Sequence, residues 1–140
     1  MLPKKIAMLE PEPLGEISGG AHVKNDLFWV FNDNENIPHT PPTLYEIDIS
    51  QSIVSTRSWV IEGAKQEDWE DMDVWHHPKE GLQLVIADTG GNNTLKDTFE
   101  VYIVSPTSVD NTVLHAKKKQ ISFEDFGPRD IEGFAIDPLN

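Results

Sequence analysis

The chain repeats a short pattern of acidic and apolar residues three times. Glu16-Ile-Ser-Gly-Gly is followed 52 positions later by Asp68-Trp-Glu-Asp-Met, and after a further 62 positions by Asp130-Ile-Glu-Gly-Phe. Each copy opens with an acid and an apolar residue, then a polar or acidic one. Repetition over such a distance is typical of architectures built from similar units that bury their faces against neighbouring units.

Short β-rich runs, separated by turn residues, fill the chain between the repeated patterns. Alternating polarity and β-branched or aromatic residues indicate strands, and no sustained helical periodicity is present. The expected strands are Glu16–Val23, Leu27–Asp33, Thr43–Ile49, Ile53–Ile61, Asp68–Trp75, Leu82–Asp88, Phe99–Val104, Lys118–Phe123 and Asp130–Asp137. Each repeat thus holds four strands, and the ninth strand opens a third repeat.

Four strands in a repeat of about 50–60 residues are typical of a β-propeller blade. We therefore predict an all-β fold, a β-propeller fragment of about two four-stranded antiparallel blades plus the first strand of a third. Residues 1–13 form an N-terminal extension of a partial propeller at 14–140, with blades at about 14–62, 67–125 and 129–140. The remaining blades of the same polypeptide are its expected partners. The alternative is one eight-stranded sandwich with accidental internal similarity.

Charge and composition narrow the possible partners. The chain has 11 Lys and Arg against 24 Asp and Glu, a formal net charge of −13. Such a balance argues against nucleic acid, whose phosphates are bound by basic residues, and against anionic membranes. No apolar run reaches the roughly 20 residues of a membrane span, so no membrane insertion is expected. Ile6–Leu9 is too short for the core of a signal peptide.

The recurring acids form a candidate metal site. Side chains at positions i and i+2 lie on the same face of a strand. Asp68 and Glu70 therefore point to one side, and so do Asp130 and Glu132. If the opening strands line a central channel, these groups converge from successive blades. The candidate ligands are Glu16, Asp33, Asp68, Glu70, Asp88, Asp130 and Glu132, with Asn32, Asn34, Asn36, Asn92 and Asn93 as neutral oxygen donors. Oxygen ligands alone favour Ca²⁺ over Mg²⁺.

A structural role competes for part of this set. Asp33 and Asp88 end the second strand of their repeats, where an aspartate often accepts backbone N–H groups of a turn, and we prefer that role for both. For Glu70 and Glu132 the ligand and structural roles are equally well supported. Gly90 and Gly91 are expected to adopt positive φ in a tight turn.

Five motifs carry a family resemblance across residues 13–138. They are Glu16-Ile-Ser-Gly19, Asn32-Asp-Asn-Glu35, Asp68-Trp-Glu-Asp71, Ala87-Asp-Thr-Gly-Gly-Asn92 and Asp130-Ile-Glu-Gly133. Together they resemble six-bladed, TolB-like and NHL-like bacterial β-propellers, although Gly91 replaces an acid and Asn34-Glu35 replaces Ser-Gly. The resemblance implies a propeller, often a periplasmic or secreted one. Related propellers include calcium-dependent lactonases and phytase-like phosphoesterases.

The leading functional hypothesis is a binding or scaffold propeller with an acidic, calcium-binding central or top-face site. The alternative is a Ca²⁺-dependent hydrolase of lactones or phosphoesters, in which the ion polarises the substrate or activates water. The sequence has no nucleophile elbow, so whether the protein is an enzyme stays open. A small-molecule or glycan ligand is a third hypothesis, although core packing is the better expectation for Trp29, Trp59, Trp69 and Trp75.

Overall fold

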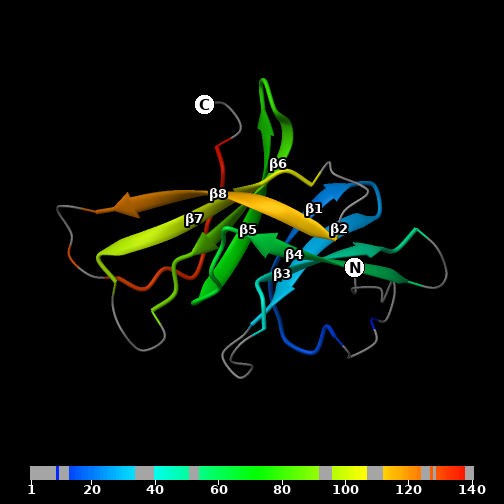
Figure 1. Cartoon of the computed structure of the whole chain (residues 1–140), viewed down its shortest axis with the longest axis horizontal. Helices are drawn as coiled ribbons and strands as arrows, with labels where there is room; N and C mark the ends of the chain where they lie inside the picture. Colours follow the sequence, from blue (N-terminus) through cyan, green and yellow to red (C-terminus); the bar gives the residue numbers. More distant parts are fainter. Residues whose placement is uncertain are drawn as a thin grey trace, which may run out of the picture.

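The computed structural model describes residues 9, 13–33, 40–50, 54–91, 96–106, 112–123, 127 and 129–137. These residues form eight β-strands and no helix, which confirms the all-β expectation (Figure 1). None of them belongs to a helix able to cross a membrane. The strands are β1 (Ile17–Lys24), β2 (Leu27–Asn32), β3 (Thr43–Asp48), β4 (Ser55–Glu62), β5 (Trp69–His77), β6 (Gly81–Asp88), β7 (Thr98–Val104) and β8 (Val113–Ser122).

The strands form two antiparallel meanders of four strands each. β1 to β4 pair in chain order, and so do β5 to β8. A short parallel pairing of Val60–Glu62 in β4 with Val113–His115 in β8 joins the meanders into one mixed sheet of order β1-β2-β3-β4-β8-β7-β6-β5. Because β1 and β5, the two ends of this order, also contact each other, the sheet curls into a nearly closed barrel.

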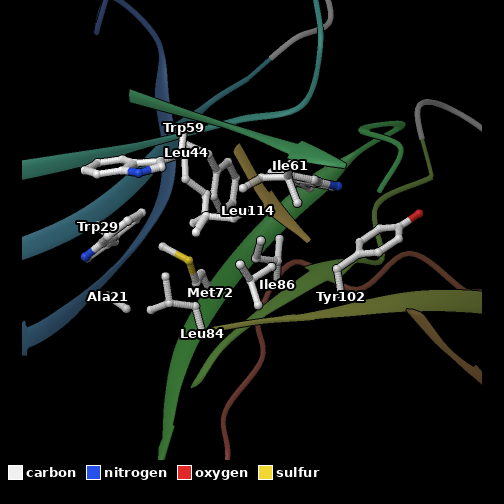
Figure 2. Close-up of a cluster of buried hydrophobic side chains, with 13 residues drawn as sticks. Ala21, Trp29, Leu44, Trp59, Ile61, Met72, Leu84, Ile86, Tyr102 and Leu114 are labelled. Carbon is white, nitrogen blue, oxygen red and sulfur yellow. The ribbon is translucent and has the colours of Figure 1, made fainter. Parts of the chain in front are cut away.

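The main core lies between the two meanders (Figure 2). The Trp29 and Trp59 rings lie 4.7 Å apart, and the Phe31 ring meets Trp69 edge-on at 5.4 Å. Burying each large apolar side chain contributes about 1.5–3 kcal/mol, so these aromatic residues hold the two layers together. Three of the four tryptophans are therefore core residues, as expected, and Trp75 is half-buried on β5.

Both meanders also carry apolar side chains on the faces that point away from this core. The outer face of β1–β4 holds a second buried cluster of Leu14, Val30 and Ile47. The outer face of β5–β8 forms a mainly apolar groove of about 320 Å³. It is lined by Trp75, Val85, Val101, Ile103, Lys119, Ile121, Phe134 and Ile136. Sheets that are apolar on both faces are typical of architectures in which further layers cover them.

Two strand expectations are wrong. β8 begins at Val113 rather than Lys118, because Val113 and Leu114 gain a partner in β4 that local sequence does not reveal. Asp130–Asp137 is not a strand, because no described backbone pairs with it in a ladder; the nearest pairing is an isolated bridge between Lys96 and Arg129.

Side chains of β5 bind the backbone of the Asp130–Asp137 segment instead. Phe134 N donates to Asp71 Oδ2 (3.0 Å) and Ile136 N donates to Asp73 Oδ2 (2.8 Å). The Oδ1 atoms of the same two aspartates accept the N–H groups of Met72 and Val74. Asp71 and Asp73 thus bind the C-terminal segment along the edge of β5 that does not pair with β6.

Candidate functional site: an acidic cluster where β5 begins

Four of the predicted carboxylates interact where β5 begins and β6 ends. Asp68 and Glu70 come from the start of β5, and Asp130 and Glu132 come from the C-terminal segment. Glu70 shares a hydrogen bond with Glu132. The negative charges of Asp68, Glu132 and Asp130 also lie close enough to raise the pKa of Glu70. The structure therefore brings together the acids that open the second and third repeats.

The loop after β6 holds the C-terminal segment at this cluster. Thr89 Oγ1 donates to Ile131 O (2.7 Å), and Ile131 N donates to Thr89 O (3.3 Å). Gly91 N donates to Asp130 Oδ1 (2.9 Å). These three bonds fix the backbone between Asp130 and Glu132, which places both of their side chains beside Glu70.

Gly90 is the point of closest approach between this loop and the acids. Its N–H donates to Asp68 O (3.2 Å). A Cβ atom at this position would collide with Glu70 Oε1 and Asp68 Oδ2. Positive φ, which was expected here, occurs among the described glycines at Gly63, Gly81 and Gly127 instead. A side chain at position 90 would therefore have to displace the carboxylate ends of Glu70 and Asp68, and the periodicity of the sequence carries no signal of this crowding.

Burial and like charge act together on Glu70. Burial is the largest influence, followed by the charges of Asp68 and Glu132, the hydrogen bond to Glu132 and the charge of Asp130; together they raise the pKa of Glu70 to about 7. A carboxyl group with this pKa exchanges its proton near neutral pH. The cluster therefore holds a proton that it loses near neutral pH.

The cluster is not a finished coordination site. Within the described part of the chain, no three His, Asp or Glu side chains are already arranged to hold a metal ion. Asp130 and Glu132 are exposed, whereas Asp68 and Glu70 are half-buried. Metal binding would therefore require the two exposed carboxylates to close onto the two that β5 holds.

Asp88 has a structural position next to the cluster. It is 3% exposed, and its carboxylate accepts the N–H groups of Asp68 (3.0 Å) and Glu67 (3.2 Å). Lys96 Nζ lies 3.6 Å from its Oδ1 atom. Burial raises the pKa of Asp88, and these donors partly oppose the rise. The carboxylate of Asp88 thus holds the backbone at Glu67 and Asp68. This position fits the structural role that we prefer for Asp88.

Glu16 and Asp33 belong to the equivalent place in the first repeat. Glu16 lies exposed before β1, and Asp33 N donates to Glu16 O (2.7 Å) after β2. Neither residue is among the groups that raise the pKa of Glu70. Of the expected asparagine donors, Asn32 ends β2, where its side-chain amide donates to Pro13 O. The other four, Asn34, Asn36, Asn92 and Asn93, lie outside the described residues.

Sequence reasoning did not identify Thr89, Asp71 or Asp73 as partners of the C-terminal segment. A signal was available for the aspartates, because Asp71 and Asp73 alternate along one side of β5. No family model, curated protein or solved structure matches this chain. The site is interpreted from its own geometry.

Proposed function

We propose that the chain forms consecutive blades of a β-propeller binding domain whose acidic cluster binds Ca²⁺. The two four-stranded meanders, packed face to face with their first strands in contact, support the architecture. The apolar outer face of β5–β8 offers a surface on which a further blade of the same polypeptide would pack.

Contacts between equivalent positions of the repeats support the same architecture. Gly19, Asp71 and Gly133 occupy matching places in the three copies of the repeated pattern. A Cβ at Gly19 would lie 3.2 Å from Asp71 Cα, and Asp71 in turn binds the N–H group of Phe134, next to Gly133. The third copy thus lies against β5 much as β5 lies against β1, which is the relation expected between successive blades.

One observation carries the cation proposal: burial, together with the neighbouring carboxylates of Asp68, Glu132 and Asp130, raises the pKa of Glu70 to about 7. Loss of the Glu70 proton leaves mutual repulsion that a divalent cation relieves. All four side chains offer carboxylate oxygens. Asp68 and Glu70 are half-buried, whereas Asp130 and Glu132 are exposed. Ca²⁺ accepts six to eight oxygens in flexible geometry, whereas Mg²⁺ demands a near-ideal octahedron, so Ca²⁺ fits better.

Calorimetric titration and thermal melting of the EDTA-treated full chain test this proposal. We expect CaCl₂ to give saturable heat and a higher Tm, and MgCl₂ to give clearly weaker effects. Glu70→Gln should weaken Ca²⁺ binding by tenfold or more. Glu62→Gln is the matched control, since Glu62 lies in β4 and pairs with His115 rather than with the cluster. Absence of both heat and a melting shift in the unmodified chain would refute the cation site.

The raised pKa of Glu70 also favours a second candidate, a Ca²⁺-dependent hydrolase of lactones or phosphoesters. A carboxyl group that titrates near 7 is suited to general acid–base catalysis. Turnover of a panel of lactones and phosphoesters should then require Ca²⁺ and disappear in Glu70→Gln. A calcium-loaded protein that turns over none of them would leave the binding function alone.

A further inference from the structure

The inner face of the first meander changes character along its length. Toward one end it is core, where Leu44 pairs with Trp59. Two residues further along β3, Trp29, Glu46 and Arg57 lie directly opposite one another across β2, β3 and β4. Charged side chains therefore stand on the face that looks toward the second meander, a position where binary patterning predicts apolar residues.

A groove of about 500 Å³ opens between the two meanders at this place. Its apolar lining consists of Val23, Leu27, Trp29, Leu82 and Pro106, and its polar lining of Lys24, Glu46 and His76. This volume falls in the range of small-molecule sites. His76 and Leu82 flank the β5–β6 turn, whereas Glu70 and Gly90 lie at the other end of the same hairpin. The groove is therefore separate from the acidic cluster.

A polar hollow of about 400 Å³ adjoins the groove and shares Lys24, Leu27 and Glu46 with it. Asp26, Asp48 and Arg57 also line this hollow. Glu46 thus stands at the boundary between an apolar compartment and a polar one. A ligand that fills both needs an apolar body and a charged or polar head.

We propose that this inter-sheet groove binds a small organic cation, with an aromatic or branched apolar body against Trp29 and Leu82 and an ammonium group at Glu46. The site is distinct from the proposed Ca²⁺ site and does not depend on it. An ammonium group suits the carboxylate that the strand ladder holds between Trp29 and Arg57.

The balance of charge around the groove favours a cation over an anion. The groove itself is lined by one carboxylate, Glu46, with Lys24 and His76. When the adjoining hollow is included, the three carboxylates of Asp26, Glu46 and Asp48 outnumber the two permanent cations, Lys24 and Arg57. Lys24 and Arg57 are exposed, and their long side chains can reach solvent, whereas Glu46 is half-buried. Burial is the main cause that raises the pKa of Glu46, and the charges of Arg57 and Lys24 oppose that rise only in part, so a bound ammonium would compensate the remaining cost. The net charge of −13 attracts cations over a longer range.

Two probes of similar shape and opposite charge test the proposal: 2-phenylethylammonium and 3-phenylpropanoate. Calorimetry on the full chain in EDTA should give a Kd at or below about 1 mM for the ammonium and at least tenfold weaker binding for the carboxylate. Amide NMR shifts should change at Trp29, His76 and Leu82 and stay unchanged at Glu70. Because EDTA removes Ca²⁺, failure here leaves the calcium proposal standing, and the reverse also holds.

Two kinds of variant test separately whether binding needs the charge of Glu46 and whether it needs the open space of the groove. Glu46→Gln should weaken ammonium binding by tenfold or more, and Glu80→Gln, which removes an exposed carboxylate paired with Lys117, should leave it unchanged. Leu82→Trp should abolish binding by filling the groove, which keeps the test decisive if Glu46→Gln does not fold. Equal or tighter binding of 3-phenylpropanoate, or no ammonium binding up to about 10 mM, would overturn the proposal.

Discussion

At the scale of single residues, the acidic cluster depends on a backbone atom as much as on side chains. Gly90 lets the loop after β6 approach Asp68 and Glu70 so closely that no Cβ fits between them. The loop can then hold Asp130 and Ile131 through Gly91 and Thr89. One missing side chain thus allows two distant segments to share a site.

Gly90→Ala should therefore destabilise the protein by about 1 kcal/mol, at the low end of overpacking costs, because the added methyl group has to displace the flexible carboxylate ends of Glu70 and Asp68. Urea unfolding followed by tryptophan fluorescence measures the change. Gly133→Ala is the matched control, since a Cβ there meets no described atom within 4 Å and should change stability by less than about 0.5 kcal/mol. Equal effects of the two substitutions would contradict the crowding at position 90.

Glu70 makes stability depend on pH in an unusual direction for a carboxylate. Its pKa is raised from 4.5 to about 7, so the folded state holds the proton more tightly than the unfolded state. The resulting stabilisation is complete below pH 4.5 and is lost as the pH rises through 7. Glu70→Gln mimics the protonated form and should remove this dependence.

In metal-free buffer, Glu70→Gln should thus be more stable than the unmodified chain at pH 8, by about 1 kcal/mol once solvent screening is allowed for. Near pH 4 the two proteins should have the same free energy of unfolding. Urea titrations across this range, read as the difference between the two proteins, measure the effect. A difference that does not grow with pH would show that Glu70 does not hold the proton.

At the scale of elements, β5 binds the segment beside it through aspartate side chains, whereas an inner strand binds its neighbours through backbone hydrogen bonds. Asp71 and Asp73 bind both their own following N–H groups and those of Phe134 and Ile136. Carboxylates placed along a strand edge also discourage unwanted pairing with other chains. The edge of β5 is thus specific for the segment that carries Asp130 and Glu132.

Replacing both Asp71 and Asp73 with alanine should release this segment while the hairpin of β5 and β6 remains. Hydrogen exchange at Phe134 N and Ile136 N should accelerate by at least about tenfold, since each loses its acceptor. The amides of β6 should keep their protection. Asp26→Ala, in the turn between β1 and β2, should leave exchange at Phe134 unchanged.

At the scale of the whole molecule, the two meanders of the sheet enclose one core, and each presents a second apolar face. The outer face of β5–β8 is only partly covered by Phe134 and Ile136, and Ile121 on its edge is 39% exposed. Contiguous exposed apolar surface marks interaction sites or promotes association. This face is consistent with the proposed stacking of further blades.

Ile121→Lys should lower the binding of a hydrophobic dye such as ANS and reduce concentration-dependent association, because it places a charge in this face. Ile17→Lys is the matched control, since Ile17 is 41% exposed but lies at the start of β1, away from the groove. Dye titration and sedimentation velocity of the full chain report both effects. An equal decrease in both variants would show that the face has no special role.

The sequence alone determined most of the strands, because alternation and β-branched residues act locally. Leu27–Asn32 and Gly81–Asp88 lie within one residue of their expected bounds for that reason. Internal repetition in the sequence also singles out Asp68, Glu70, Asp130 and Glu132.

Only the tertiary structure decided what these elements face. Asp130–Asp137 has strand-like sequence but no described ladder partner, so β5 holds it through aspartate side chains. Gly90 lies close to Glu70, and Glu46 points into the space between the meanders. Both arrangements depend on residues far apart in the chain. Local propensity fixes a strand, whereas long-range pairing and packing fix its neighbours, its inward face and the chemistry they create together.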